Sequence, residues 1–252
     1  MPDEVRIDVF DEIAHAFEDP RGEKPVPGIG VEGSGALSEV QCQGRDDAFP
    51  TTEAGDSEYF AHLMRGRLRY DHSRRRWFRF GPHQWHLDST TQVMQAALKV
   101  MRCRQQQALT IADSNERKQR MEWALRGESE ARLKHLLDLA ATHPVLAVDG
   151  TDWDADPWVL GVQNGLVDLQ TGTVRPGSPE DRVTKVAAVP YDSAATCPRW
   201  CGFVREVCND DEDLAAFLQR SIGYALTGET GEQCFSSCLA WGRTGKVPSL
   251  KP

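Results

Sequence analysis

The stretch GRLRYDHSRRRWFRFGPHQWHLD, residues 66–88, decides the fold of the first half of the chain. Leu68 and Tyr70 alternate with arginines, and this two-residue period is typical of an extended strand with different side chains on its two faces. Gly81 and Pro82 separate two further runs that are rich in aromatic residues, which β-strands favour. The stretch therefore predicts a small antiparallel β-meander.

Arginines and aromatic rings are interleaved along this stretch. Guanidinium groups can follow a phosphate backbone while aromatic rings stack on bases, so the mixture is typical of surfaces that bind single-stranded nucleic acid. The alternative is a solvated, charged hairpin whose rings pack inward. The residues that we predict to bind nucleic acid are Arg67, Arg69, Tyr70, Arg74, Arg75, Arg76, Trp77 and Arg79.

The overall charge limits how such binding can occur. The 252-residue chain has 29 Lys and Arg against 38 Asp and Glu, which gives a formal charge of -9. Indiscriminate binding to nucleic acid rests mainly on the neutralisation of phosphates, so an acidic chain is poorly suited to it. A local basic patch is therefore the form of binding that the composition allows.

The sequence carries no sign of export or membrane insertion. No apolar run approaches the roughly 18 residues that a membrane span requires, and the opening MPDEVRIDVFDEI lacks the regions of a signal peptide. We therefore expect a cytoplasmic protein without a membrane partner. The seven cysteines form neither a dense framework nor a common zinc pattern, so we expect reduced thiols and no metal site.

The remaining sequence divides into regions of different pattern, and we expect an α+β protein. Residues 91–144 place apolar side chains at steps of three and four, as in amphipathic helices. These positions are Val93, Ala96, Ala97, Val100, Met101, Leu133, Leu136, Leu137 and Ala140.

Residues 166–175 predict a β-hairpin that turns at Gly172, and a helix capped by Asp210 or Asp211 follows it. The expected regions are a flexible leader at 1–45, the β-meander at 46–90, a helical segment at 91–144, a hairpin-and-helix segment at 145–233 and an aberrant tail at 234–252.

Three alternating carboxylates suggest a calcium loop but do not complete one. Asp152, Asp154 and Asp156 have the spacing of the first ligands of an EF-hand. However, Pro157 occupies the position that requires glycine, and Gln163 replaces the bidentate glutamate. The sequence excludes an EF-hand and leaves a turn-rich acidic surface or, as an alternative, a looser metal-dependent site.

The end of the chain carries a remnant of a phosphate-binding loop. Gly242, Gly245 and Lys246 match part of the G-x-x-x-x-G-K-[ST] motif, in which backbone amides and the lysine hold phosphates. Ala240 replaces the first glycine, and Val247 followed by proline replaces the hydroxyl residue that would bind magnesium. We therefore expect these three residues to bind nucleotide poorly.

Many short motifs also occur in a characteristic order between residues 46 and 233. They include Thr52-Glu53-Ala54-Gly55-Asp56, Arg69-Tyr70, Trp77, Trp85, Asp156-Pro157, Asn164-Gly165, Asp168-Leu169, Pro179-Glu180-Asp181, Tyr191-Asp192, Phe217-Leu218-Gln219-Arg220 and Leu226-Thr227-Gly228. Together they resemble the region that precedes a superfamily 3 helicase motor in the phage and plasmid primase-helicase family, which is related to the poxvirus primase-helicase. The resemblance implies a DNA replication protein whose intact relatives use ATP and Mg²⁺ to unwind DNA as ring-shaped oligomers.

The resemblance further implies what should follow Gln233, namely a hydrophobic strand and the loop G-x-G-x-N-G-K-S-T-F. The residues present are CFSSCLAWGRTGKVPSLKP instead. When the codons of residues 239–249 are read from their third bases, they permit the whole missing loop. We therefore expect that a frameshift after Gln233 replaced the motor domain with an unrelated tail, and the nucleotide sequence downstream decides this.

The expected function is that of the N-terminal part of a phage or plasmid primase-helicase, which binds DNA or organises subunits. We expect no catalytic residue and no cofactor in this chain, because ATP and Mg²⁺ belong to the motor of the intact family. The expected partners are DNA and, in the intact family, further copies of the same chain. One alternative is an assembly module without affinity for DNA. The other is a metal-dependent hydrolase that uses Asp152, Asp154 and Asp156.

The incomplete phosphate-binding loop leads to a prediction about ATP hydrolysis. We expect negligible magnesium-dependent release of phosphate from ATP, because neither the first glycine nor the magnesium-binding hydroxyl is present. Phosphate release by the purified chain and by a Lys246→Ala variant measures this. A robust turnover that the Lys246→Ala change abolishes would contradict the prediction.

Overall fold

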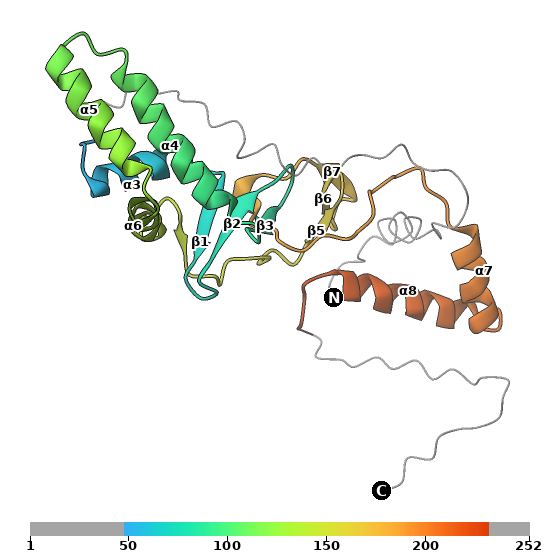
Figure 1. Cartoon of the computed structure of the whole chain (residues 1–252). Helices are drawn as coiled ribbons and strands as arrows, with labels where there is room; N and C mark the ends of the chain where they lie inside the picture. The colour runs from blue at the N-terminus through green and yellow to red at the C-terminus, as the bar shows by residue number, and fades with distance from the viewer. Residues whose placement is uncertain (1–47, 232–252) are drawn as a thin grey trace, which may run out of the picture.

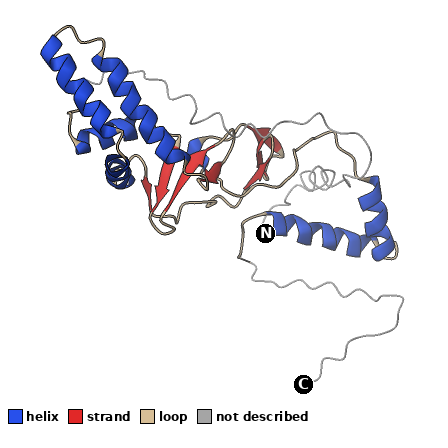
Figure 2. Ribbon diagram, in the orientation of Figure 1, coloured by secondary structure: helices blue, strands red, loops and turns tan. Residues whose placement is uncertain are grey.

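The computed structural model describes residues 48–231, which form six α-helices, one 3-10 helix and two small β-sheets. This arrangement confirms the α+β class. Four helices lie at one end, the two sheets follow, and two further helices lie at the other end (Figure 1; Figure 2). The leader at 1–45, the tail at 234–252 and the remnant nucleotide site of Gly242, Gly245 and Lys246 lie outside the described residues.

The first sheet contains the predicted meander. Its strands are β1 (Leu68–Asp71), β2 (Arg76–Phe80), β3 (Trp85–Leu87) and β4 (Ala147–Val148), in the order β3-β2-β1-β4. The first three strands are antiparallel neighbours, and the turn at Gly81 separates β2 from β3 as predicted. The two-residue strand β4 pairs in parallel with β1, and the helical region lies between them in the sequence. The sequence pattern did not indicate this fourth strand.

A layer of helices packs on one face of this sheet. The helices are α3 (Glu53–Leu63), α4 (Gln92–Ala108), α5 (Ser114–Gly127) and α6 (Glu130–Ala141). All nine apolar positions predicted from the helical period are buried, and they meet Phe60, Met64 and Leu68 in one core. The sheet and the helices therefore share a hydrophobic interior, and the burial of this apolar area is the main force that holds them together.

A buried ion pair connects the four helices. Arg104 Nε of α4 lies 2.9 Å from Asp56 Oδ1 of α3, and only 2% and 8% of the two side chains are exposed. Trp123 of α5 donates a hydrogen bond from Nε1 to Asp56 Oδ2 at 3.0 Å. Arg132 of α6 in turn lies 4.8 Å from the centre of the Trp123 ring. Each helix thus contributes one side chain to a continuous set of contacts around the Asp56 carboxylate.

The second sheet has three antiparallel strands, β5 (Val159–Val162), β6 (Gly165–Asp168) and β7 (Thr173–Arg175). The hairpin between β6 and β7 is the predicted one, and Gly172 adopts a φ of 68° that favours glycine. A small core of Val162, Val167, Leu169 and Tyr191 covers one face. A 3-10 helix, η2 (Pro179–Asp181), leads back toward the first sheet, where Trp85 Nε1 donates to Pro179 O at 3.0 Å.

The last two helices are α7 (Pro198–Val207) and α8 (Glu212–Leu226). Asp211 caps α8 as predicted, by accepting a hydrogen bond from the Leu214 amide, and the helix ends before Thr227. The end of α8 returns to the second sheet, because the Gly228 amide donates to Pro157 O at 2.8 Å. None of the helices in residues 48–231 is long and apolar enough to cross a membrane.

The cysteines correct one expectation. Cys197, Cys201 and Cys208 are free thiols, as expected. Cys103 of α4, however, is disulfide-bonded, so the expectation of reduced thiols throughout is wrong for this residue. The spacing of cysteines in the sequence did not indicate this, because the pairing of distant thiols depends on their separation in the folded chain.

The buried ion pair leads to a prediction about stability. An Arg104→Met variant should lose about 3–5 kcal/mol of unfolding free energy, because the Asp56 charge would remain buried without its partner. Urea unfolding followed by circular dichroism measures the change. Arg102→Met is the matched control in the same helix, since the Arg102 side chain is 60% exposed, and it should cost less than about 1 kcal/mol. Equal losses in the two variants would contradict the importance of the ion pair.

Candidate nucleic-acid interface

The strand register distributes the side chains of the β1–β2 hairpin between two faces. Tyr70 lies opposite Trp77 in the ladder, and both rings lie on the face that carries the helices. Their ring centres are 5.0 Å apart. Trp77 also contacts Phe60 of α3 edge-on, and both Tyr70 and Trp77 remain partly exposed. These two predicted rings are therefore fixed by packing and still accessible.

The other aromatic residues of the meander pack on the opposite face. Phe78, Trp85 and Val148 form a second buried cluster there with Trp153, which follows β4 in the chain. The ring centres of Phe78 and Trp153 are 4.9 Å apart, and those of Trp85 and Trp153 are 5.7 Å apart. For these rings the alternative interpretation, in which aromatic residues of the hairpin pack inward, describes the structure.

Asp71, at the end of β1, ties the hairpin turn to this second cluster. Its carboxylate is fully buried and accepts hydrogen bonds from Ser73 Oγ at 2.7 Å, the Arg74 amide at 2.9 Å and Trp153 Nε1 at 2.9 Å. Burial alone would raise the pKa of Asp71, but these hydrogen bonds and the charge of Arg74 outweigh burial and hold the pKa below its ordinary value. The carboxylate is therefore ionised at neutral pH and organises the turn.

The chain passes very close to this carboxylate at Gly150. Gly150 has a φ of 91°, a left-handed conformation that favours glycine. A Cβ atom at this position would lie 2.6 Å from Asp71 Oδ1 and 2.2 Å from Ser73 Oγ. The absence of a side chain thus allows the segment after β4 to fold over the turn and bring Trp153 to Asp71.

The three arginines of the turn differ in their contacts. Arg74 forms an ion pair with Asp71 at 3.6 Å, and its guanidinium lies 5.7 Å from the centre of the Phe78 ring. Arg75 adopts a left-handed conformation with a φ of 54° and is exposed. Arg76, the first residue of β2, is also exposed. The turn therefore presents two accessible guanidinium groups beside a third that is held in place.

The other three predicted arginines lie away from the turn and are partly buried. Arg69 donates from Nη1 to Val145 O at 2.8 Å, and burial, followed by the charge of Arg182, lowers its pKa. Arg79 lies opposite His86 in the ladder, where burial and then the charge of Arg79 lower the pKa of His86. Arg67, just before β1, is also partly buried. The eight predicted residues thus do not form one continuous surface.

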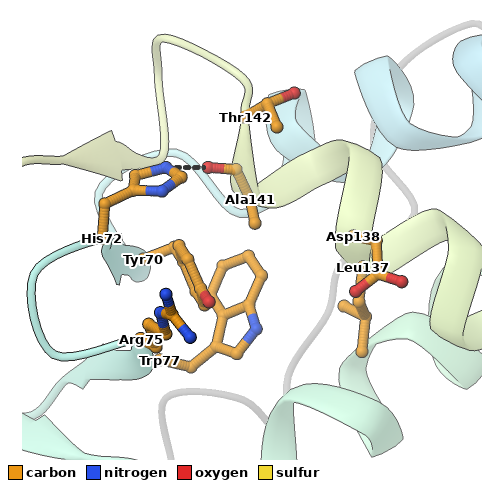
Figure 3. Close-up of a pocket in the computed structure, with 8 residues that line it drawn as sticks. All are labelled: Tyr70, His72, Arg75, Trp77, Leu137, Asp138, Ala141 and Thr142. Carbon is orange, nitrogen blue, oxygen red and sulfur yellow. Dashed lines mark hydrogen bonds between the residues drawn. The ribbon is translucent and has the colours of Figure 1, made fainter.

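A groove of about 370 Å³ lies between the hairpin and α6 (Figure 3). Its walls contain three of the predicted residues, namely Tyr70, Arg75 and Trp77. The sequence pattern did not indicate the other lining residues, which are His72, Leu137, Asp138, Ala141 and Thr142. Four of these come from α6 and the residue that follows it, so only the folded chain brings them to the hairpin.

The three carboxylates of the alternative metal-dependent site are each occupied by contacts with other protein groups. Asp152 forms an ion pair with Arg182, and Asp154 accepts hydrogen bonds from the amides of Thr184 and Lys185 at 2.6 Å and 3.1 Å. Asp156 caps a turn through the Trp158 amide. Within residues 48–231, no group of three His, Cys, Asp or Glu residues is placed to hold a metal ion. The three carboxylates instead fasten the loop that connects the two sheets.

Comparison with known proteins identifies the family of the chain. The D5 N terminal like family matches residues 57–209, which is more than half of the chain. The chain therefore belongs to this family, the N-terminal domain of D5-like primase-helicases of phages and viruses. The matched range contains the whole first sheet, the groove and the second sheet. No curated protein matches the chain.

The buried carboxylate at the turn leads to a second prediction about stability. Asp71→Asn should lose roughly 1.5–3 kcal/mol of unfolding free energy at neutral pH, because the hydrogen bonds to a charged acceptor are weakened. The folded pKa of Asp71 is lowered, so its stabilisation is complete above the ordinary value of about 3.9 and is lost as the pH falls through the folded pKa. The difference between the wild type and the variant should therefore shrink in acid.

Urea unfolding at neutral pH and at several acidic pH values measures this difference. Asp192→Asn is the control, because Asp192 is an exposed carboxylate in a loop. A deficit of Asp71→Asn that stays constant down to strongly acidic pH would show that the charge of Asp71 does not stabilise the fold.

Proposed function

We propose that this chain binds single-stranded DNA through the β1–β2 turn and the adjoining groove, as part of a replication primase-helicase. The observation that carries the proposal is the placement of the exposed Arg75 beside the accessible rings of Tyr70 and Trp77, with the exposed Arg76 next to it on the same turn. Guanidinium groups neutralise phosphates, and aromatic rings stack on unpaired bases. Membership of the D5 N terminal like family supports this proposal, because a primase-helicase acts on DNA.

The rigidity of the turn favours binding of a ligand over the alternative, in which the charged turn only faces solvent. Asp71 holds the Ser73 hydroxyl and the Arg74 backbone amide through the hydrogen bonds described above. Arginines on a fixed turn lose less conformational entropy on binding than arginines on a mobile loop. The -9 charge of the whole chain restricts binding to this local basic region.

Subunit assembly is a second candidate function, and the exposed apolar side chains of α7 and α8 favour it. Phe203 and Val207 of α7 are 53% and 58% exposed, and Phe217 of α8 is 55% exposed. Apolar groups that remain accessible at this level often mark protein interfaces. In this proposal the occupant is a second copy of the chain, in line with the ring-shaped oligomers of the resembled family.

Light scattering tests the assembly proposal. The wild type should form oligomers, and Phe203→Ser with Phe217→Ser should shift it toward the monomer. Oligomers that survive both changes would place the subunit contact elsewhere. Oligomers without any affinity for DNA would favour assembly over nucleic-acid binding as the function of this region.

The DNA-binding proposal predicts the effect of the two accessible arginines. Arg75→Gln with Arg76→Gln should weaken binding to a labelled single-stranded oligonucleotide at low salt by roughly tenfold or more. The slope of log affinity against log salt concentration should fall by about 0.7 for each phosphate that the variant no longer neutralises. Fluorescence anisotropy at several salt concentrations measures both quantities. Arg74 is left unchanged, because its contact with Asp71 supports the fold.

The matched control is Arg102→Gln with Arg126→Gln, which removes the same charge from exposed positions on α4 and α5. This variant should bind nearly as well as the wild type, because both guanidinium groups of the turn remain. It changes the net charge by the same amount as Arg75→Gln with Arg76→Gln, so general electrostatic attraction changes equally in the two variants. Equal weakening in both double variants, or no weakening in either, would show that the β1–β2 turn is not part of the interface.

A further inference from the structure

The groove between the hairpin and α6 carries opposite charges on its two walls. Arg75 lies on the hairpin side, and Asp138 lies on the α6 side (Figure 3). Neither side chain forms an ion pair or hydrogen bond with any residue in the described part of the chain. A ligand that spans the groove can therefore meet a free cation at one end and a free hydrogen-bond acceptor at the other.

The floor of the groove between these charges is aromatic. The rings of Tyr70 and Trp77 both line the space between the hairpin and α6, and they contact each other edge to face with their planes at 61° (Figure 3). His72 closes one end, with its ring 4.9 Å from that of Tyr70 and its Nε2 donating to Ala141 O at 2.9 Å. The volume of about 370 Å³ lies at the lower end of the ~300–1,000 Å³ range of small-molecule sites.

On the basis of the proposed DNA binding, we propose that this groove holds one unstacked guanine base of the bound strand. The base would stack on the face of one of these two rings and contact the other at its edge, and Arg75 would bind its phosphate. Asp138 would accept hydrogen bonds from the Watson–Crick edge of the base. This placement uses both free charges and the aromatic floor at once.

The chemistry of the Asp138 carboxylate selects guanine among the four bases. An ionised carboxylate has two acceptor oxygens and no donor. The Watson–Crick edge of guanine offers two adjacent donors, N1–H and N2–H, which match a carboxylate in a bidentate pair. Adenine and cytosine each offer one amino donor beside a ring nitrogen acceptor. In thymine the single N3–H lies between two carbonyl oxygens, which repel the carboxylate.

The test compares oligonucleotides that differ at one base. A thymidine decamer, the same decamer with one central guanine, and one with a central hypoxanthine are each titrated with the full chain in an anisotropy assay. Guanine should bind roughly five- to tenfold more tightly than thymine, in the range of a bidentate contact between side chain and base. Hypoxanthine lacks the 2-amino group and should fall between them.

Asp138→Asn should remove most of the preference for guanine, because the amide presents one acceptor instead of two. Asp138 is exposed, so this change should leave the fold intact. Glu130→Gln, at an exposed position of the same helix, is the matched control and should keep the preference. Titration with free dGMP distinguishes a single nucleotide from a strand as the occupant, and a preference of dGMP over dTMP that depends on Asp138 would also support the groove.

The outcomes separate this inference from the DNA-binding proposal. If all decamers bind equally in the wild type and in Asp138→Asn, while Arg75→Gln with Arg76→Gln still weakens binding, the guanine site is overturned and DNA binding by the turn stands. If neither the decamers nor dGMP bind, both proposals are overturned.

Discussion

The geometry of the candidate interface depends on one buried carboxylate. Asp71 lies at the end of β1 with no exposed surface, so its charge requires hydrogen-bond donors within the protein. The donors come from the turn, through Ser73 and Arg74, and from Trp153, which lies 82 positions away in the sequence. The same group therefore sets the direction of the turn and holds the segment that leads to the second sheet. The arginines at the turn are presented by a structure that this contact makes rigid.

The helical layer is organised by a similar constraint. Asp56 is buried among helices and is neutralised by Arg104, and the surrounding aromatic contacts reach α5 and α6. This network connects α6 to α5 and α3 through Arg132 and Trp123, and α6 supplies Asp138 to the wall of the groove. Both walls of the groove thus depend on buried carboxylates, although the groove itself is accessible. The D5 N terminal like match covers the sheet, α4, α5 and α6, and it begins at residue 57, just after Asp56.

Local sequence patterns predicted much of the fold. The period of Val93, Val100 and Leu136 identified buried helical faces, Gly172 identified a hairpin, and Asp211 identified a helix start. The patterns could not reveal contacts between distant positions. Nothing near Asp71 indicates Trp153, and nothing in the helical period distinguishes Asp138 from Glu130, the other exposed carboxylate of α6. The arginine-rich composition likewise did not show that Arg69 is held by Val145 O while Arg75 faces the groove.

The parallel pairing of β4 with β1 has a consequence for the order in which the chain folds. Tyr70 and Ala147 are partners in this ladder, and α4, α5 and α6 all lie between them in the sequence. Closing so long a loop costs conformational entropy, which the short pairing of β4 with β1 offsets only after it has formed. We therefore expect β4 to join the sheet after the helices have formed. On the ribosome, the sheet is therefore completed only when the segment through Val148 has emerged, and the contact of Trp153 with Asp71 follows that step.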